Sequence, residues 1–460
     1  MSDLTRRDFV KTTGLALGAA GLPATAAFAM QDGGEANALE ELRVLAIGVE
    51  GIGNLDRRQV NSHPRARIVG LCDIDTGRIE SAKKDHPDAF TDTDYRRIFA
   101  DRGDEFDAVI VSTPDHHHAP MMLTALAHDK HCYGQKPLVH QLEELVMMER
   151  AMAAKPHLMT QVGNQRMVER GRRAAVEILR MGQLGKAIEA HVWTGSVQGR
   201  FTGGQMGDVK DPPANIDWDL WLGPCEAKPY RDGMAHYNWR KWWDHGSAGM
   251  GDWGVHLLDI IMYSYDELMS PISVKTHTPR AADWFHAAHC KSTLTYAVAG
   301  DMFAHDRFPI HYSDSNLSVS RAALGIPGDA WPDSNMTVVV CEEGTLALTA
   351  GGGLEIWRGG EMTEGWRMPD LPDFPRLNHW HAWVDNCLGG DTELRTPFVD
   401  GIRITEPAIL AAKATRYPGQ ELLWDKANLA FTNHAEATDT IVRRAYRDGF
   451  APPAVGGALN

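Results

Sequence analysis

The chain has 460 residues, of which 43% are hydrophobic and 23% are charged, a balance typical of a globular protein with two or three domains. Its 61 acidic and 46 basic residues give a formal net charge of −15, and no basic cluster stands out beyond the N-terminus. Nucleic acid and anionic membrane surfaces are therefore not expected as partners. No segment carries an apolar run long enough for a transmembrane helix.

The N-terminus has the pattern of an export signal. Arg6 and Arg7 precede a weakly apolar, Gly/Ala-rich run at 13–22, and Ala-Phe-Ala at 27–29 offers a cleavage site. The run is too short and too rich in glycine to span a bilayer. We therefore predict a twin-arginine signal peptide over 1–29, read by the twin-arginine export machinery, and a periplasmic or otherwise exported mature chain. A disordered cytoplasmic tail is the alternative.

After a predicted linker at 30–42, the stretch from Val44 to Asp73 reads as a strand, a glycine-rich turn, a helix and a second strand. Such a turn lets the main chain approach a pyrophosphate at a helix N-terminus. Asp73 lies twenty residues beyond Gly53, where an acid can accept hydrogen bonds from the adenosine ribose. The candidate cofactor contacts of the turn are Gly48, Gly51, Ile52 and Gly53.

The turn departs from a strict GxGxxG pattern because Glu50 stands where the second glycine would be. A carboxylate beside a pyrophosphate is repulsive unless its side chain points away. A glycine-rich turn in another kind of α/β protein is the alternative, but the flanking strands and Asp73 favour a dinucleotide site. Asp73 favours NAD because it repels a 2′-phosphate, whereas the nearby Arg78 keeps NADP open.

Strand and helix patterns alternate from residue 43 to residue 157, which is typical of a parallel, doubly wound sheet. The clearest are strands at 107–113 and 131–133 and helices at 116–129 and 141–154.

A second, α+β domain with an open sheet is predicted over 158–450. Its helical patterns lie at 171–181, 252–266, 379–388 and 406–416, and its strand patterns at 187–194, 337–341 and 344–349. The last two strands alternate as in an antiparallel sheet.

Six cysteines are spread along the chain without CxxC or metal-finger spacing. A protein that is exported already folded forms its core under reducing conditions. We therefore expect mostly free, buried thiols and assign no disulfide.

Four segments together resemble a known enzyme family. After the glycine turn come Thr-Pro-Asp-His-His-His at 113–118, Gly-Gln-Lys-Pro-Leu at 134–138 and Gly-Asp-Trp-Gly-Val-His-Leu-Leu-Asp at 251–259. In this order they resemble the oxidoreductases named for glucose–fructose oxidoreductase, inositol dehydrogenase and the rhizopine protein MocA (Gfo/Idh/MocA). The segments at 379–385 and 424–425 resemble an exported branch of that family.

The resemblance implies a Rossmann domain, a C-terminal domain on a large open, mainly antiparallel sheet, bound NAD or NADP, and a homo-oligomer formed through the exposed sheet face. Lys136 takes the position of the catalytic lysine in the family's Glu-Lys-Pro turn, although Gln135 replaces the glutamate. Asp252 and His256 match the family's catalytic Asp and His. The remaining candidate cofactor contacts are Thr113, Pro114, His118, Gln135, Lys136 and Asn164.

Alcohol oxidation gives these residues roles without the family. Removing a hydride from an alcohol carbon requires a base for the hydroxyl proton, and histidine suits this because its unperturbed pKa is about 6.5. Asp252 and His256 are four residues apart, so on a helix they share a face, and Asp252 can orient the imidazole or bind a second substrate hydroxyl. A Lys136 ammonium would stabilise developing alkoxide charge. Asp259 is a weaker candidate on the same side.

Six tryptophans lie between residues 218 and 253, directly before and within the Asp/His segment. Indole faces pack on the apolar faces of sugar rings, so we expect a carbohydrate substrate. A buried core cluster or a subunit interface is the alternative. The candidate substrate contacts are Arg166, Trp239, Arg240, Asp252 and His256.

Several histidines offer metal-ligand atoms, but we expect no bound metal. Asp252 and His256 lack a well-placed third ligand, and a run such as 116–118 is more often a polar helix start. His379 and His381, two apart, face different sides of a helix and are interpreted as structural or cleft-lining.

Export in the folded state allows a tightly held cofactor to travel inside the protein, and no pool of free NAD(P) exists outside the cytoplasm. We therefore predict an NAD(P)-dependent oxidoreductase that acts on a hydroxyl of a sugar, polyol or glycoside and recycles a bound nicotinamide. Two alternatives fit the same residues. One is a redox-neutral glycosidase that works by oxidation, elimination, hydration and reduction, and the other is a sugar-binding relative without catalysis.

Overall fold

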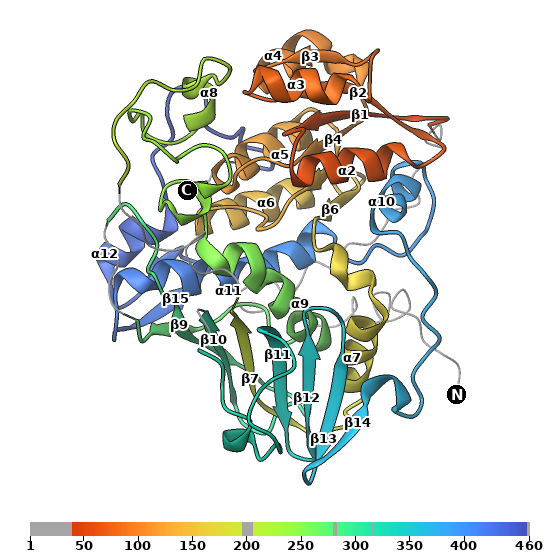
Figure 1. Cartoon of the computed structure of the whole chain (residues 1–460), viewed down its shortest axis with the longest axis vertical. Helices are drawn as coiled ribbons and strands as arrows, with labels where there is room; N and C mark the ends of the chain where they lie inside the picture. The colour runs from red at the N-terminus through yellow and green to blue at the C-terminus, as the bar shows by residue number, and fades with distance from the viewer. Residues whose placement is uncertain (1–38, 196–205, 279–282, 315–316, 458–460) are drawn as a thin grey trace, which may run out of the picture.

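The computed structural model describes residues 39–195, 206–278, 283–314 and 317–457. These residues form two lobes, each built on one sheet, with helices packed between the sheets (Figure 1). The predicted signal peptide and most of the predicted linker lie outside the described residues, so both stay predictions. Within the part of the chain that is described, no helix is long and apolar enough to cross a membrane.

The N-terminal lobe contains a six-stranded parallel sheet in the order β3-β2-β1-β4-β5-β6. Its strands are β1 (Leu42–Ile47), β2 (Ala66–Cys72), β3 (Phe90–Asp92), β4 (Ala108–Val111), β5 (His131–Gly134) and β6 (Thr160–Val162). Its helices are α2 (Ile52–Asn61), α3 (Thr76–Lys83), α4 (Tyr95–Arg102), α5 (His118–Ala127) and α6 (Leu142–Ala154). The predicted doubly wound sheet is confirmed, and the strand order reverses between β1 and β4, where such sheets bind ligands.

Both faces of this sheet are covered, which explains the composition of its strands. All four residues of β4 are buried, and β1 has only one partly exposed position. Continuous apolar runs of this kind are typical of parallel strands covered on both faces by helices. The carboxyl ends of β1, β2 and β4 therefore carry the turns that the sequence assigns to a cofactor.

The C-terminal lobe contains a ten-stranded sheet in the order β14-β13-β12-β11-β7-β10-β9-β8-β15-β16. Its strands are β7 (Ala187–Thr194), β8 (Ser273–Thr276), β9 (Lys291–Ala297), β10 (Arg307–Asp314), β11 (Asn335–Cys341), β12 (Gly344–Thr349), β13 (Leu354–Arg358), β14 (Glu361–Glu364), β15 (Glu421–Asp425) and β16 (Ala430–Phe431). Only the β7–β10 pair is parallel among these described strands, so the predicted mainly antiparallel sheet is confirmed.

Helices of the C-terminal lobe lie between the two sheets and beside the first one. They are α7 (Arg170–Arg180), α8 (Trp218–Leu222), α9 (Val255–Ser264), α10 (His379–Cys387), α11 (Phe398–Lys413) and α12 (Ala435–Ala437). Helix α11 is buried over most of its length and contacts α6 and β6 on one side and α9 and β9 on the other. Helix α10 packs against α2 of the N-terminal lobe (Figure 1).

Two boundaries differ from the sequence prediction. The predicted domain boundary at residue 157 falls just before β6, which pairs with β5 as the last strand of the parallel sheet. The predicted helix at 252–266 is two elements, a π-helical turn at Met250–Gly254 followed by α9. All six cysteines are free and buried, as predicted.

Candidate active site

The glycine turn between β1 and α2 has the geometry of a phosphate-binding turn. Gly48 has a φ of 80°, and a Cβ there would lie 2.4 Å from the Ser112 carbonyl oxygen. A Cβ at Gly53 would lie 1.9 Å from the Gly48 carbonyl oxygen. At Gly51, by contrast, a Cβ would meet no atom within 4 Å, and no side chain caps α2. The open space at an uncapped helix N-terminus fits a dinucleotide pyrophosphate.

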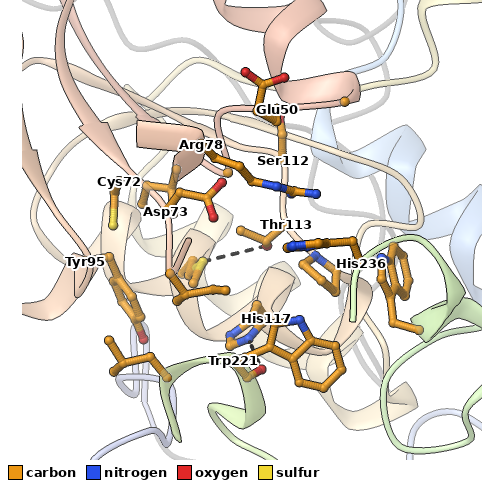
Figure 2. A pocket seen from close by; sticks show the side chains of 18 of the residues that line it. Glu50, Cys72, Asp73, Arg78, Tyr95, Ser112, Thr113, His117, Trp221 and His236 are labelled. Atoms are coloured by element: carbon orange, nitrogen blue, oxygen red, sulfur yellow. Dashed lines mark hydrogen bonds between the residues drawn. The ribbon is translucent and has the colours of Figure 1, made fainter. Parts of the chain in front are cut away.

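The two acidic residues of this region have different orientations. Glu50 is among the residues that line the pocket, and Figure 2 shows its carboxylate turned away from the other labelled side chains. Asp73 is buried and accepts main-chain hydrogen bonds from Val49 (3.1 Å) and Asp75 (3.1 Å), which orient its carboxylate. Burial raises the pKa of Asp73, and Arg78 opposes that rise. Arg78 lines the same pocket, so the positive charge that would suit the 2′-phosphate of NADP is present beside Asp73.

A cavity runs along the carboxyl ends of β1, β2 and β4 and is closed on the opposite side by the C-terminal lobe. Figure 2 shows Asp73 and Arg78 on one side and His117 and Trp221 on the other. The predicted site residues that line it are Gly48, Gly51, Ile52, Asp73, Thr113, Pro114, Trp239 and Arg240. Its other walls include Tyr95, Met121, Leu220, Trp221, His236, Tyr237 and Phe450.

The predicted catalytic residues lie directly behind one wall of this cavity. Arg240 lines the cavity, and its Nε donates to Asp252 Oδ1 at 3.1 Å. The same oxygen accepts from Lys136 Nζ at 2.9 Å, and Lys136 also donates to the Asp252 main-chain carbonyl at 2.8 Å. Burial opposes the charge of Asp252, but the two cations outweigh it and hold its pKa well below the usual range. Lys136, Asp252 and Arg240 therefore form one charged cluster.

The expected partnership of Asp252 with His256 is wrong. Among the described residues, Asp252 bonds to Lys136 and Arg240, and the buried Nδ1 of His256 has no hydrogen-bond partner. The physical reason is the π-helical turn at Met250–Gly254, which breaks the regular four-residue spacing. Burial, assisted by Lys136, lowers the pKa of His256 well below its usual value, so its imidazole is neutral and a weaker base than a free histidine.

Asp259, the weaker candidate, has a structural partner. Its Oδ1 lies 2.7 Å from Arg172 Nη1, and both side chains are fully buried. Arg172 also donates to the His256 carbonyl, so this ion pair fixes the start of α9. Asp259 acts through the helix and does not reach the cavity walls.

The turn after β4 contains one residue that the sequence analysis did not single out. Asp115 is buried beside the charged cluster, and burial raises the pKa of its carboxyl to about 7 against the pull of Arg240. Asp115 can therefore hold a proton near neutral pH. His118, predicted beside the nicotinamide, instead places its ring nitrogens near the carbonyls of Pro137 (2.6 Å) and Thr113 (2.9 Å). His118 therefore connects the turn after β4, at Thr113, with the turn after β5, at Pro137.

Gln135 makes a contact that no local motif predicts. Its Nε2 donates to Asp56 Oδ2 at 2.9 Å, and its Oε1 accepts from the Lys136 main chain at 3.3 Å. Asp56 is fully buried and also accepts from Ser112 Oγ (2.7 Å) and Trp380 Nε1 (2.9 Å). The Asp56 carboxylate of α2 therefore links the end of β4 (Ser112), the turn that holds Lys136 (Gln135) and helix α10 (Trp380). Asp56 sits on the polar pattern of α2, but only the fold brings Gln135 to it.

Asn164 and Arg166 lie between the lobes. Asn164 Nδ2 donates to the Val255 carbonyl at 3.1 Å and holds the start of α9. Arg166 donates to the Ala350 carbonyl at 2.7 Å, and its guanidinium lies 5.6 Å from the Trp253 ring centroid. Neither residue lines the cavity described above.

The tryptophan cluster divides into two groups. Trp221 and Trp239 line the cavity, and Arg240 lies 4.3 Å over the Trp239 ring. Trp242 packs on Phe285, whereas Trp218 stacks on Trp221 with a centroid distance of 4.6 Å. Part of the cluster is therefore core, and part faces the space where a ligand would lie.

His116 lies in a group that sequence spacing did not reveal. Ligand atoms of His116, Cys225 and His245 lie within 4.8 Å of one another, and all three residues are buried. The ring nitrogens of His116 lie 2.9 Å from the Trp221 carbonyl oxygen and 3.2 Å from the His245 carbonyl oxygen, and Cys225 Sγ donates to the Asp244 carbonyl at 3.0 Å. These contacts indicate a structural role: the three side chains hold the loop before α9 against the N-terminal lobe.

Two family models match the chain. The model of the oxidoreductase family NAD-binding Rossmann fold (Gfo/Idh/MocA) matches residues 42–164, and the model of the family's C-terminal alpha/beta domain matches residues 178–304. Together the two matches span more than half of the chain.

Curated relatives match over about a third of the chain. Inositol 2-dehydrogenase of Burkholderia multivorans is 30% identical over 152 residues, covering 32% of this chain and 44% of that protein. Glycosyl hydrolase family 109 protein 2 of Shewanella sp. strain ANA-3 is 30% identical over 166 residues, covering 32% of this chain and 36% of that protein. The chain thus spans less than half the length of these relatives.

Solved structures share the fold over most of both chains. WlbA dehydrogenase from Bordetella pertussis, solved with NADH and UDP-GlcNAcA, has a TM-score of 0.58 at 16% identity and covers 84% of this chain and 99% of that one. Aldose-aldose oxidoreductase from Caulobacter crescentus has a TM-score of 0.54 at 14% identity, with coverage of 84% and 100%. At these identities the likeness concerns the fold alone.

Proposed function

The chain belongs to the Gfo/Idh/MocA oxidoreductase family, and from this premise we propose that it is an NAD(P)-dependent oxidoreductase acting on a hydroxyl of a sugar, polyol or glycoside. One observation carries the proposal: the Lys136–Asp252–Arg240 cluster adjoins a cavity that begins at a phosphate-binding glycine turn. We propose NAD as the preferred cofactor because Asp73 opposes a 2′-phosphate.

The residues divide the chemistry of alcohol oxidation among them. When bound, the oxidised nicotinamide supplies the hydride acceptor. Lys136 holds a positive charge where alkoxide character develops, and Asp252 fixes the ammonium through two contacts. We propose His256 as the group that takes the hydroxyl proton, because it is a neutral histidine beside Lys136. Arg240 joins the cluster to the cavity wall and can orient a second substrate hydroxyl.

We propose that the nicotinamide stays bound through the catalytic cycle and is recycled on a second substrate. The cavity supports this because the C-terminal lobe covers it: His236 Nε2 lies 3.0 Å from Asp75 Oδ2, and Asp217 donates to the Ile74 carbonyl at 3.0 Å. The predicted export would require such retention. Native mass spectrometry of the mature protein, purified without added cofactor, should show one bound nucleotide per chain. A folded but nucleotide-free protein would contradict retention.

The test of the main proposal is a substrate screen. Sugars and polyols are added to the purified protein while absorbance in the reduced-nicotinamide band is followed, and His256→Ala is run in parallel. The proposal predicts that a substrate reduces the nicotinamide in wild type and not in the variant, while both bind cofactor. A wild type that binds sugars without any change in this band is a binding protein instead.

Redox-neutral glycoside cleavage is the second candidate, favoured by the match to glycosyl hydrolase family 109 protein 2. Transient oxidation acidifies a neighbouring C–H, elimination breaks the glycosidic bond, water adds, and reduction restores the sugar. Chromogenic glycosides incubated without an acceptor separate the two candidates. Released aglycone supports the glycosidase, whereas an oxidised sugar that appears only with an acceptor supports the oxidoreductase.

We also propose a homo-oligomer formed through the open face of the ten-stranded sheet. Light scattering on the purified chain tests this, and a monomer at working concentration would contradict it.

A further inference from the structure

Two histidines and a glutamate meet on one face of the ten-stranded sheet. Strands β7 and β10 run parallel and side by side in the middle of this sheet, with His191 directly opposite His311 (Figure 1). Glu189 lies two positions before His191 on β7 and therefore points to the same face. The alternate residues of both strands, such as Val192 and Ile310, are buried in the core. The three side chains thus lie together on the face away from that core.

These side chains bring three metal-ligand atoms to one place. Nε2 of His191 lies 2.9 Å from Glu189 Oε1, and Nε2 of His311 lies 3.6 Å from Glu189 Oε2. The two imidazole rings are stacked, with centroids 4.9 Å apart and an interplanar angle of 26°. Because the rings are nearly parallel and both Nε2 atoms face the same carboxylate, two nitrogens and one oxygen border one small space.

Thr293 of the neighbouring strand β9 fixes the orientation of His311. Its Oγ1 lies 3.1 Å from His311 Nδ1, whereas the 3.6 Å between His311 Nε2 and Glu189 is longer than a hydrogen bond. With its hydrogen on Nδ1, facing the hydroxyl, the neutral ring presents the Nε2 lone pair to the carboxylate. Histidines that bind metals are held in this way, by a hydrogen bond from the nitrogen that does not bind the ion.

The charge and the exposure of the group also suit a cation. The His191 imidazole, and after it His311, holds the pKa of Glu189 well below its usual range, so the glutamate is a carboxylate at neutral pH. The side chains of His191, Glu189 and His311 are 14%, 32% and 36% exposed. A hydrated ion can therefore reach the group from solvent in a single chain.

We propose that Glu189, His191 and His311 form a binding site for a divalent transition metal ion of the zinc class. Imidazole nitrogens and a carboxylate oxygen are ligands that Zn²⁺ takes in proteins, and three protein ligands leave the fourth position to water. None of the three residues lines the cofactor cavity, so the site is independent of the proposed function. Sequence spacing does not reveal it, because the two histidines belong to strands far apart in the chain.

The buried group of His116, Cys225 and His245 is less suited to a metal ion. Cys225 Sγ donates to the Asp244 carbonyl, and Arg444 Nη1 lies 3.6 Å from the same sulfur. A guanidinium at that distance repels a second cation. The group on the sheet instead combines a negative charge with two nitrogens that face it.

The test is a Zn²⁺ titration by calorimetry on purified protein that carries no histidine tag and has been stripped of metal with EDTA. Wild type should bind one ion per chain with a Kd of about 10 μM or tighter. Glu189→Gln and His311→Gln each remove a ligand and should weaken binding at least about 100-fold, and Thr293→Val, which keeps all three ligands, should weaken it about 10- to 100-fold.

His157→Gln is the matched control, because His157 also lies 3.6 Å from a carboxylate (Asp129) but outside this group. Its zinc affinity should stay within about twofold of wild type. Zn²⁺ should raise the Tm of wild type and of His157→Gln but not of Glu189→Gln, and without metal the four variants should unfold cooperatively like wild type.

Zinc binding by wild type that is weaker than about 10 μM would overturn the site. Equal zinc affinity of wild type, Glu189→Gln and His311→Gln would also overturn it, because the ion would then bind elsewhere. Nicotinamide binding is measured on the same samples and should be equal in all of them. Failure of the metal site would therefore leave the proposed function standing, and failure of nicotinamide binding would leave the metal site standing.

Discussion

The two ends of the cofactor cavity differ in how far apart their residues lie in the sequence. At the pyrophosphate end, Gly48, Gly51 and Gly53 lie within six residues of one another, and the turn is shaped by its own main chain. At the reacting end, Lys136 comes from the turn after β5, Asp252 from a π-helical turn of the other lobe, and the two meet only in the folded protein. The first end is local, and the second depends on how the lobes pack.

The two ends therefore differ in how far the structural effect of a substitution extends. A change in the glycine turn acts on a few neighbouring atoms, whereas a change at the reacting end alters a charge balance shared by both lobes. The Asp56 carboxylate connects the two ends because it binds Ser112 and Gln135 at once. Substitutions can therefore separate the ends or couple them.

The largest effect is expected at the reacting end. Lys136→Met removes the positive charge that faces developing alkoxide, so kcat/KM should fall about 1000-fold. NADH affinity should fall by a much smaller factor, because the glycine turn and Asp73 line the cavity and hold the rest of the dinucleotide. Steady-state kinetics and an NADH titration measure both quantities. A variant that keeps a tenth of wild-type kcat/KM would remove Lys136 from the chemistry.

At the pyrophosphate end, two glycine variants of the same turn should differ. Gly53→Ala places a Cβ 1.9 Å from the Gly48 carbonyl oxygen, and the turn must open. Dinucleotide affinity should fall about 100-fold or the protein should lose about 3 kcal/mol of stability. Gly51→Ala meets no protein atom, so its stability cost is the strain of a main-chain conformation (φ 64°, ψ −121°) that residues with a Cβ rarely adopt, about 2 kcal/mol. A loss of stability in Gly51→Ala that exceeds the loss in Gly53→Ala, measured by thermal unfolding, would contradict this description of the turn.

The residue that couples the ends can be tested by exchanging charges. Gln135→Glu places a second carboxylate against the buried Asp56, which should reduce the free energy of unfolding by about 3 kcal/mol. The double variant Asp56→Asn with Gln135→Glu returns one charge to the pair and should recover at least half of that loss. Denaturant unfolding measures both. A double variant less stable than Gln135→Glu alone would show that the charge at position 56 has another role.

The smallest effect is a pH dependence at Asp115. Its folded-state pKa of about 7 lies above the unfolded value, so its contribution to stability is present at low pH and is lost as pH rises through about 7. Between about pH 5 and pH 7 the wild type should lose about 2 kcal/mol through this group, and Asp115→Asn should not. Thermal unfolding across this range checks it. Parallel curves for the two proteins would mean that Asp115 is ionised in the native state.

The local features of the fold could be predicted from the sequence. The glycine turn, Asp73 and the apolar strands lie within short stretches, so periodicity and spacing are sufficient to identify them. The open antiparallel sheet followed from alternating strands such as β11 and β12. Lys136 was identified by resemblance to a family, and Asp252 by that resemblance and by its spacing from His256. Nothing in the sequence shows that Lys136 and Asp252 contact each other.

Long-range contacts could not be predicted. The partnership assigned to Asp252 and His256 assumed a regular helix, and the π-helical turn gives Asp252 to Lys136 and Arg240 instead. Nothing in the sequence distinguishes Asp56 from the other residues of its helix or Phe450 from the rest of the C-terminal segment. Only the fold brings Asp56 to Gln135 and Phe450 to the cavity. We assigned β6 to the second domain because the sequence of a short strand does not show which sheet the strand joins. In the structure β6 pairs with β5 of the parallel sheet.

A crystal structure of the protein with bound NAD would show directly how the cofactor lies in the cavity. We expect the pyrophosphate at Gly51, the adenosine ribose at Asp73 and the nicotinamide ring against Lys136 and Asp252. A dinucleotide bound in the opposite direction, or bound outside this cavity, would contradict this expectation.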